Sequence, residues 1–594
     1  MTFQAVGVPE KHHLADHSVD NRMIMLAAMA MLVGTGGAIG AWLLIHLIGL
    51  ATNLFWFGRL SLQPVQITQT AVGAWVVVIP IIGSMIVGLM ARYGSDKIRG
   101  HGIPEAIETI LFGESRLSLK VALLKPLSSA ISIGSGGPFG AEGPIIMTGG
   151  AIGSLFAQCF HLSAAERKTL LVAGAAAGMT AIFGTPMAAI LLAIEVLLFE
   201  WKPRSFVPVV VSVIVAFAWR PWMIGGGAMF PFEALTPAGL PPIAAAAGVG
   251  LIVGLQATLL STSLYRVEDV FHRLPVHWMW WPAIGAVVVG IGGLIDAHVL
   301  GAGYQSIQAL LDGSLTLRAM LALLMIKAVV WLVALGSGTS GGVLAPLLIL
   351  GGAAGCLAGY FLPGGPGFWA MIGMAGIMSG AMRAPLTGAL FAVELTGHFD
   401  ALPLAMTAAA SAYAVSVLLM RRSILTEKIA RRGRHILQEY SVDPLDLMQA
   451  SQLMTHAPAT LPGTMSITEA MAFFAGGAAH RSYPVVADDG ALLGLVSRTD
   501  ALRWQVGEMA DNASLAETLS DASLPVAYPE TPIGIVADLM VDSGIGRIPI
   551  IEPDTRRVVG MLSRQDLLKA RSAHRQSETG RTRFVRQDIS ASDA

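Results

Sequence analysis

The sequence predicts a mainly α polytopic membrane protein, followed by a smaller cytosolic α/β module. Of the 594 residues, 54% are hydrophobic and only 13% are charged, which is typical of proteins with many membrane-spanning helices. Gly and Pro interrupt most of the apolar runs, and several runs are too short to cross a bilayer core of about 30 Å. From about residue 435 the chain becomes charged and has no spanning run. We therefore expect broken, tilted helices first and a separate domain after them.

Two glycine-rich segments recur at a fixed distance in the apolar part. Gly134–Pro144 has a counterpart 202 residues later in Gly336–Pro346, and a second pair, Thr185–Glu195 and Ala384–Glu394, is offset by 199 residues. Backbone this irregular is tolerated at membrane depth only where it lines a cavity or an ion site. Two copies of a broken-helix unit indicate an internal repeat with a site between its halves.

Glu142 lies in the first of these segments, just before an apolar run that predicts a helix. The unpaired N–H groups and the dipole of a helix N-terminus attract anions. A carboxylate at such a position competes with a permeating anion, and it opens the path when it is protonated or displaced. We interpret Glu142 as a gate, and a simple helix cap is the alternative interpretation.

Three short segments resemble the filter motifs of the CLC family of chloride channels and transporters. Gly100–Pro104 is similar to the family's GSGIP, Gly140–Pro144 to GREGP, and Gly342–Pro346 to GIFAP. The resemblance covers roughly residues 23–433. The anion-binding residues that it implies are His101, Gly102, Ile103, Gly140, Ala141, Glu142, Gly143, Val343, Leu344 and Leu425.

The same resemblance implies the architecture and the activity. The fold would be a CLC-type inverted repeat of about residues 23–220 and 241–426. The protein would be a homodimer with one pore per subunit, and it would carry chloride or another monovalent anion across the cell (inner or plasma) membrane.

Departures from the family pattern bear on the mechanism. Proton-coupled members usually carry a second glutamate directly after the position of Glu195, where this chain has Val196, which cannot bind a proton. Glu195 itself should point elsewhere, because one residue along a helix turns a side chain by about 100°. His101 and Leu425 replace the family's serine and tyrosine, so both hydroxyls that touch the central anion are missing. We favour passive, channel-like conduction, with a proton-coupled antiporter as the alternative and nitrate as an open alternative anion.

Two basic side chains near the filter motifs have competing interpretations. Lys125 either supplies positive potential near the anion path, or it snorkels to the interface or caps a helix. His101 either contacts the anion or simply packs at a junction between loop and helix.

The charged C-terminal part contains a repeat of its own. Gly494–Asp500 recurs 66 residues later as Gly560–Asp566, each after a short β-rich run. This resembles a tandem CBS pair, a module that often binds adenine nucleotides (ATP, ADP or AMP). The resemblance implies that Asp500 and Asp566 bind ribose hydroxyls and that Ser497 and Ser563 contact phosphate. The alternative is that each serine only caps the following helix.

The charge distribution suggests domain limits and orientation. We expect a cytosolic tail (1–22), the membrane domain (23–433), a linker (434–446), two CBS repeats (447–507 and 516–573) and a disordered tail (574–594).

Basic residues crowd the end of the last span, so that end and both termini should face the cytosol. Each membrane repeat then crosses an odd number of times, which inverts the second relative to the first. The basic residues are Arg421, Arg422, Lys428, Arg431, Arg432 and Arg434.

Several other classes of protein fit the sequence poorly. A net charge of −1 gives no sign of a nucleic-acid partner. No His-Glu-x-x-His cluster is present, which argues against a membrane metalloprotease, and we expect no enzyme activity, no metal and no required cofactor. A CBS-linked divalent-cation transporter should place several acidic residues in its spans. The acidic residues in the apolar segments of this chain are few and isolated, so this class is only a remote alternative.

Overall fold

The computed structural model describes residues 22–67, 73–434, 448–506, 513–519 and 524–579. The chain divides into two compact units, a membrane unit within 17–439 and a CBS unit within 440–594, and each is described by itself. The predicted tail 1–22, the linker 434–446 and the end of the chain lie largely outside the described residues.

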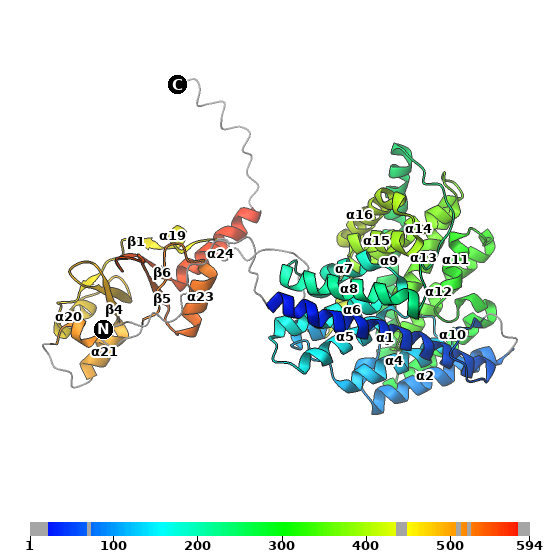
Figure 1. Ribbon diagram of the computed structural model, residues 1–594, viewed down its shortest axis with the longest axis horizontal. Helices are drawn as coiled ribbons and strands as arrows, with labels where there is room; N and C mark the ends of the chain where they lie inside the picture. The colour runs from blue at the N-terminus through cyan, green and yellow to red at the C-terminus, as the bar shows by residue number, and fades with distance from the viewer. Residues whose placement is uncertain (1–21, 68–72, 435–447, 507–512, 520–523, 580–594) are drawn as a thin grey trace, which may run out of the picture. The chain divides into compact units, whose positions relative to one another are not determined.

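The first half of the membrane unit contains helices of very different lengths (Figure 1). Among all described residues, seven helices are long and apolar enough to span a membrane, and three shorter apolar helices are too short to do so alone. The expectation of mixed full-length and broken helices is therefore confirmed. The helices of this half are α1 (Arg22–Phe57), α2 (Trp75–Tyr93), α3 (Ile103–Phe112), α4 (Leu119–Gly134), α5 (Glu142–Gln158), α6 (Ala164–Phe183), α7 (Pro186–Leu192), which continues as a π-helical turn (Ala193–Leu198), and α8 (Pro203–Met223).

The second half repeats this order. Its helices are α9 (Leu240–His272), α10 (Trp281–Ile295), α11 (Tyr304–Leu311), α12 (Leu317–Gly336), α13 (Leu344–Gly359), α14 (Pro366–Met382), α15 (Pro385–Thr396), α16 (Leu402–Leu419) and α17 (Thr426–Arg431).

A left-handed residue followed by a proline interrupts the helices at matching points of the two halves. Gly184 ends α6 in the left-handed conformation (φ 69°), and Pro186 then starts α7. In the second half Arg383 ends α14 in the left-handed conformation (φ 60°), and Pro385 starts α15. A left-handed residue after a helix and a proline at the first position of the next one favour this break.

Gly149 and Gly351, which are 202 residues apart like the two glycine-rich segments, lie where the central helices pack closely. A Cβ on Gly149 of α5 would lie 2.2 Å from the carbonyl oxygen of Gly174 on α6, and a Cβ on Gly174 would lie 2.2 Å from that of Gly149. In the second half a Cβ on Gly373 of α14 would lie 2.2 Å from the carbonyl oxygen of Gly351 on α13. Small residues permit such backbone contact between membrane helices, so this part of the sequence repeat has a packing function.

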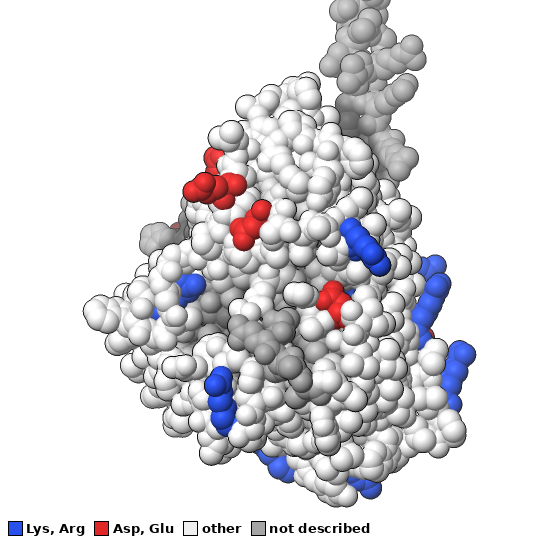
Figure 2. Space-filling view, turned by 90° about the vertical axis from the view of Figure 1, so that its right-hand side faces the viewer, with Lys and Arg blue, Asp and Glu red and all other residues white. Residues whose placement is uncertain are grey.

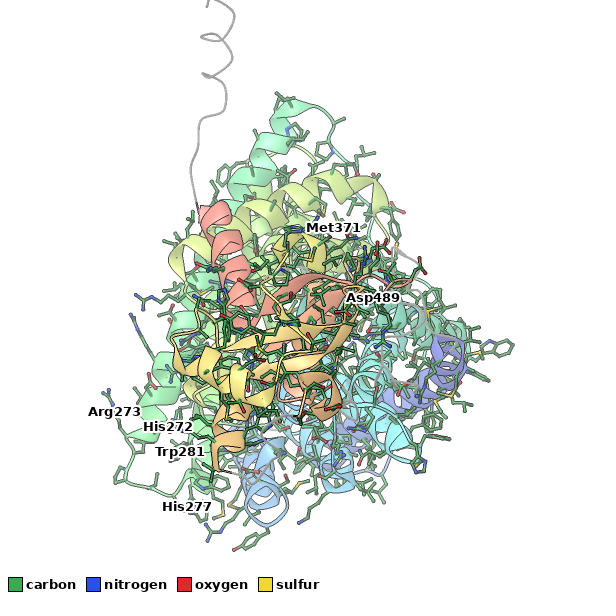
Figure 3. The ribbon with its side chains drawn as sticks, turned by 90° about the vertical axis from the view of Figure 1, so that its left-hand side faces the viewer. His272, Arg273, His277, Trp281, Met371 and Asp489 are labelled. Atoms are coloured by element: carbon green, nitrogen blue, oxygen red, sulfur yellow. The ribbon has the colours of Figure 1, made fainter. Side chains whose placement is uncertain are left out.

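Aromatic and basic side chains gather at one end of the membrane unit. In Figure 3, His272 and Arg273 at the end of α9 lie near His277 and Trp281 at the start of α10. The rings of His272 and Trp281 are 4.9 Å apart, and Arg92 Nη1 lies 2.7 Å from His277 Nε2. On the face drawn in Figure 2, Lys, Arg, Asp and Glu are sparsely distributed among uncharged residues. Both features are typical of a protein embedded in a bilayer.

The CBS unit contains two three-stranded sheets with strand orders β2-β3-β4 and β1-β6-β5. The antiparallel pairing of β1 with β6 aligns Thr455 with Met561, so the first repeat contributes a strand to the sheet of the second. The helix α24 continues into the segment that we predicted to be a disordered tail from residue 574. The elements are α19 (Ala450–Leu453), β1 (Thr455–His456), β2 (Leu461–Pro462), α20 (Ile467–Ala475), β3 (Ser482–Val486), β4 (Leu492–Ser497), α21 (Arg498–Val506), α22 (Leu515–Thr518), α23 (Ile533–Asp542), β5 (Arg547–Ile551), β6 (Val558–Ser563) and α24 (Arg564–Thr579).

Candidate functional site

The three filter-like segments meet inside the membrane unit. The N–H of Gly100 donates to the Thr339 carbonyl oxygen (3.1 Å), and the N–H of Gly342 donates to that of Gly140 (3.0 Å). Each segment leads into a helix, and Gly102, Ala141 and Val343 precede α3, α5 and α13 without a side-chain cap. The first N–H groups of three helices, including those of Ile103 and Leu344, therefore lie at or near this junction.

The Glu142 side chain is completely buried at this junction. A Cβ on Gly140 would lie 1.9 Å from Glu142 Oε2, and a Cβ on Gly342 would lie 2.6 Å from the same oxygen, so the carboxylate lies against glycines of both repeats. The peptide N–H groups of Glu142 and Ala345 are close to it, yet neither carboxylate oxygen makes a regular hydrogen bond within the described part of the chain. A helix-capping carboxylate would make such bonds, so the cap interpretation is not supported by this geometry.

His101 lies directly beside this carboxylate segment. A Cβ on Gly143 would lie 1.9 Å from the His101 carbonyl oxygen, so the two segments touch through their backbones. The His101 side chain is only 3% exposed, and neither ring nitrogen has a hydrogen-bond partner among the described residues. Buried polar groups are rarely left unsatisfied, so this ring can accept a polar ligand.

The buried Lys125 side chain connects the first filter-like segment to Ser340, just before the third, by hydrogen bonds. It is 1% exposed, and its Nζ donates to the carbonyl oxygens of Ile98 and Gly100 (2.8 Å each) and to Ser340 Oγ (3.1 Å). Interfacial snorkelling is therefore wrong for this lysine, because the ammonium group lies in the interior. Its hydrogen bonds are to loop oxygens rather than to the end of its own helix.

The second half has an equivalent lysine that sequence reasoning missed. Lys327 is fully buried, and its Nζ donates to the carbonyl oxygens of Val299 (2.8 Å) and Gly301 (3.2 Å). The position of Lys327, 202 residues after Lys125, was the available signal, since it equals the offset of the glycine-rich segments.

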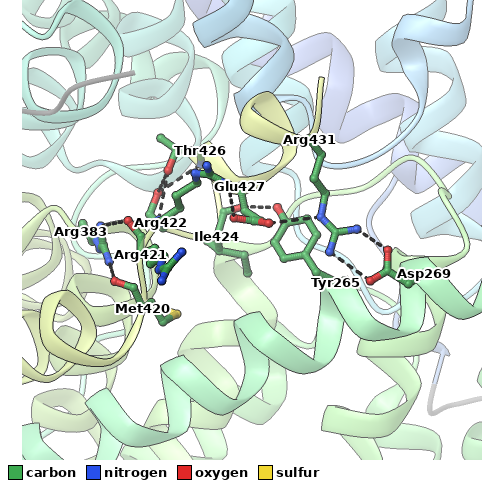
Figure 4. A network of polar contacts seen from close by, with 11 residues as sticks. Tyr265, Asp269, Arg383, Met420, Arg421, Arg422, Ile424, Thr426, Glu427 and Arg431 are labelled. Carbon is green, nitrogen blue, oxygen red and sulfur yellow. Dashed lines mark hydrogen bonds and ion pairs between the residues drawn. The ribbon is translucent and has the colours of Figure 1, made fainter. Parts of the chain in front are cut away.

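Leu425 is buried and directly precedes α17. Its neighbours Ile424, Thr426 and Glu427 belong to the polar network shown in Figure 4. The neighbouring carbonyl oxygen of Ile424 accepts a hydrogen bond of 2.5 Å from the Tyr265 hydroxyl. Arg431 pairs with Asp269 (2.5 Å), and Glu427 lies 3.3 Å from Arg431 Nε. This network anchors the loop that carries Leu425.

Ion pairs also connect α17 and the residues after it to α3. Glu105 Oε1 lies 2.8 Å from Lys428 Nζ and 3.2 Å from Arg432 Nη2. The Lys428 ammonium lies over Gly100, where a Cβ would be 2.3 Å away. In the sequence, Lys428 and Arg432 served only to assign orientation, and the structure places both beside the first filter segment.

Glu195 and its repeat counterpart Glu394 cap each other's helices. Glu195 Oε2 accepts hydrogen bonds from the N–H (2.8 Å) and the hydroxyl (2.6 Å) of Thr387 at the start of α15. Glu394 accepts from the N–H groups of Met187 (2.9 Å) and Ala188 (2.7 Å) at the start of α7. Glu195 is thus engaged at the junction of the two halves, while Val196 is buried and offers no group that could carry a proton.

In the CBS unit, the same contact between serine and aspartate occurs in both repeats, and in the first repeat the Asp500 N–H also donates to Ser497 Oγ (3.4 Å), which is the bond expected of a serine cap. The N–H and hydroxyl of Ser497 donate to Asp500 Oδ2 (2.9 and 2.6 Å), and those of Ser563 donate to Asp566 Oδ2 (3.0 and 2.6 Å). Each pair spans the end of a strand and the start of a helix. Each aspartate keeps its Oδ1 outside this pair, which leaves an oxygen for a further donor.

Comparison with known families decides the classification. The family model described as voltage gated chloride channel matches residues 82–417, more than half of the chain. The chain belongs to this family. The CBS domain model matches residues 450–507 and 517–573, so this member of the family carries a tandem CBS pair.

Curated relatives have the same family character. The chain is 26% identical over 418 residues to a putative chloride channel protein ClcB-like of Ralstonia nicotianae, covering 68% of this chain and 97% of the relative. It is 29% identical over 365 residues to the voltage-gated ClC-type chloride channel ClcB of Escherichia coli O81, covering 60% of this chain and 87% of the relative.

Solved structures share the fold. A slow cyanobacterial Cl−/H+ antiporter aligns with a TM-score of 0.60 at 21% identity, covering 70% of this chain and 99% of the other. A eukaryotic CLC transporter aligns with a TM-score of 0.57 at 19% identity, covering 92% and 98%. A CLC-type fluoride/proton antiporter aligns with a TM-score of 0.59 at 18% identity, covering 67% and 97%. The protein therefore has the CLC fold and is a multi-pass membrane protein of a chloride-transport family, not an enzyme. This family membership does not support the alternative of a divalent-cation transporter.

Proposed function

We propose that this protein conducts chloride, or another monovalent anion, passively through a pathway that the Glu142 carboxylate closes. One observation carries the proposal: Glu142 is completely buried between Gly140 and Gly342 and makes no regular hydrogen bond within the described part of the chain. An ionised carboxylate without partners is unfavourable in a protein interior. It is, however, a good substitute for an anion that would otherwise occupy the same space.

The surrounding groups are suited to weak anion binding. Helix N-termini and peptide N–H groups supply partial positive charge without a full cation at the site. Conduction requires binding that is strong enough to offset dehydration and weak enough to release the ion. Lys125, whose donors are engaged by loop oxygens, holds the segments in place instead of binding the anion directly.

Passive conduction is favoured over proton coupling by the environment of Glu195 and Val196. Proton relays through membranes use ionisable side chains. Val196 has none, and Glu195 is occupied at the start of α15. Two of the solved relatives are proton antiporters by their descriptions, so proton coupling is the alternative that the experiment must exclude.

Reconstitution into chloride-loaded liposomes tests the gate, with anion efflux and proton movement recorded together. Glu142→Gln and Glu142→Ala should both conduct and should lose most of the pH dependence of the wild-type flux. The exposed residue Glu233, in the connection between α8 and α9, provides a charge-matched control as Glu233→Gln. Wild-type pH dependence in both Glu142 variants would rule out the gating role.

The anion preference is proposed to involve His101. A ring N–H of this buried side chain would donate to the anion in place of the hydroxyls that are missing at this position and at Leu425. His101→Ser should change the ratio of chloride to nitrate flux. An unchanged ratio would leave His101 with a packing role only.

We further propose that the CBS pair binds an adenine nucleotide near Asp500 or Asp566. The equal geometry of the two Ser–Asp pairs supports this ribose contact, since in both repeats the serine bonds to Oδ2 and not to Oδ1 of the aspartate. No cofactor is required for the anion pathway itself.

The assembly is proposed from family membership alone. We expect a homodimer in the cell (inner or plasma) membrane with both termini in the cytosol. Light scattering of the detergent-solubilised protein and protease accessibility in sealed vesicles test these two expectations.

A further inference from the structure

A large cavity lies on one side of the Glu142 segment, and most of its lining lies outside the site described above. Its volume is about 590 Å³. Its walls come from the second half of α1 (Ile45–Thr52), the end of α8 with residues 224–229, and the start of α11. It reaches Ala141, whose N–H lies 3.4 Å from the Tyr304 hydroxyl oxygen that also faces the cavity. The cavity therefore ends one residue from the proposed gate.

A buried guanidinium group lies in the cavity wall. Arg220 is 5% exposed, and its Nη1 donates to the Gly227 carbonyl oxygen (2.8 Å), while Nε has no partner among the described residues. The group lies against Gly184, where a Cβ would be 2.7 Å from the Arg220 Cζ. No ion pair to an acidic side chain is formed by Arg220 within the described part of the chain.

Arg383, at the corresponding break in the second half, also has an Nε without a partner among the described residues, but its terminal nitrogens have more carbonyl acceptors than those of Arg220. Arg383 donates to the carbonyl oxygens of Ser416, Met420 and Arg421, so helix-end oxygens surround its guanidinium. Arg220 has a single carbonyl acceptor and a cavity on its open side. A buried charge without compensation is unfavourable, and an anion in the cavity would supply the missing partner.

Other groups make the same wall electropositive. The helix α11 begins at Tyr304 without a side-chain cap at Gly303, and both residues line the cavity. Behind the wall, the Lys327 ammonium donates to the carbonyl oxygen of Gly301, which also lines it. The lining includes His298, whose backbone N (3.0 Å) and ring Nδ1 (2.8 Å) lie within hydrogen-bond distance of Asp296 Oδ1.

We propose that this cavity is a second anion site, in which Arg220 binds a monovalent inorganic anion before it reaches the Glu142 segment. The binding itself does not depend on the proposed conduction. The supply of anions to the gate does rest on the proposed function, so the two aspects are tested separately.

Binding is tested by anomalous diffraction from crystals of the full chain grown in bromide. A bromide peak is expected in the cavity within contact distance of the Arg220 guanidinium. The peak should vanish in Arg220→Gln and remain in Arg220→Lys. The proposal is overturned if the wild-type cavity holds no bromide, if it holds an elongated lipid-like density instead, or if the peak persists unchanged in Arg220→Gln.

Supply is tested by the dependence of flux on the anion concentration on the cavity side of reconstituted vesicles. Arg220→Gln should raise the half-saturating concentration by about 10- to 100-fold, the range expected for loss of a charge-assisted contact, with a smaller effect on the maximal flux. Arg220→Lys should remain within a few fold of wild type. Arg383→Gln is the matched control and should leave the half-saturating concentration unchanged.

These outcomes separate the two proposals. Bromide at Arg220 without measurable anion flux would refute the conduction proposal, while the proposal that the cavity binds an anion would stand. Normal flux with the same half-saturating concentration in wild type and Arg220→Gln would refute the supply role. Size-exclusion profiles identify any variant that has failed to fold, and Arg220→Lys keeps the test valid if Arg220→Gln is lost.

Discussion

Replacing Gly140 by Ala should push the Glu142 carboxylate out of its position and open the anion pathway. The new Cβ would lie 1.9 Å from Oε2 and 2.4 Å from both Cδ and Oε1 of Glu142. Ordinary contact begins at 3.4 Å, so Oε2 must retreat by about 1.5 Å, the difference between the two distances. The obstacle is the end of a side chain and not backbone, and Gly140 does not have a positive φ. The backbone should therefore accept alanine while the carboxylate gives way.

The size of the effect follows from the cost of overpacking. Forcing one extra methyl group into a packed interior costs about 1–3 kcal/mol. The population with the carboxylate in its buried position, relative to the population with the carboxylate displaced, should then fall by about 5- to 150-fold. Each 1.4 kcal/mol corresponds to a factor of ten in such a ratio. Wild-type flux that is limited by this carboxylate should rise accordingly, and its pH dependence should weaken.

Anion efflux from proteoliposomes across a range of pH measures this effect in a double-mutant cycle. Gly140→Ala should increase flux in the wild-type background and add nothing in the Glu142→Ala background, where no carboxylate remains to be displaced. Equal effects of Gly140→Ala in both backgrounds would show that the methyl group acts on the pathway directly. No effect in either background, with an intact size-exclusion profile, would refute the proposed position of the gate.

Three further predictions concern coupling and the CBS unit. A chloride gradient should not drive protons uphill in proteoliposomes, since Val196 interrupts an ionisable relay; sustained uphill movement that Glu142→Ala abolishes would contradict this. ATP, ADP or AMP should give calorimetric heat with a 436–573 fragment, and Asp500→Ala or Asp566→Ala should weaken binding at the occupied repeat, whereas a purely capping role predicts lower stability with unchanged affinity. Ser466 and Glu469 form a capping box at the start of α20, in which the Ser466 N–H and hydroxyl donate to Glu469 and lower the pKa of its carboxyl below 4.5. The stability that this carboxylate contributes should be present above pH 4.5 and lost as the pH falls through the lowered pKa. A melting temperature of Glu469→Ala that matches wild type at pH 7 would refute it.

Fold class and repeat structure were predictable because they depend on local composition and on spacing. Long apolar runs need a bilayer, and Gly–Pro breaks recur at offsets of 202 and 199 residues. The motif-based resemblance also identified the segments that the structure brings together at Gly100, Gly140 and Gly342. The CBS repeats were visible for the same reason, since strand and helix start at equal spacing in both.

The helix at the C-terminal end shows where composition misleads. The polar sequence after residue 573 suggested disorder, yet α24 continues to Thr579. Polar residues do not prevent a helix from continuing once preceding turns are formed, because propagation is favourable after nucleation.

What the sequence by itself determined is therefore the class of the protein, the repeat, and the residues of the filter-like segments. Only the tertiary structure decided that Lys125 bonds to loop carbonyl oxygens, that Glu195 caps a helix of the other half, and that Arg220 lines a cavity beside Ala141. The physical reason is that each of these roles depends on partners or walls far away in the sequence. Spacing and composition describe neighbours along the chain, whereas hydrogen-bond partners of a buried charge are selected by packing in space.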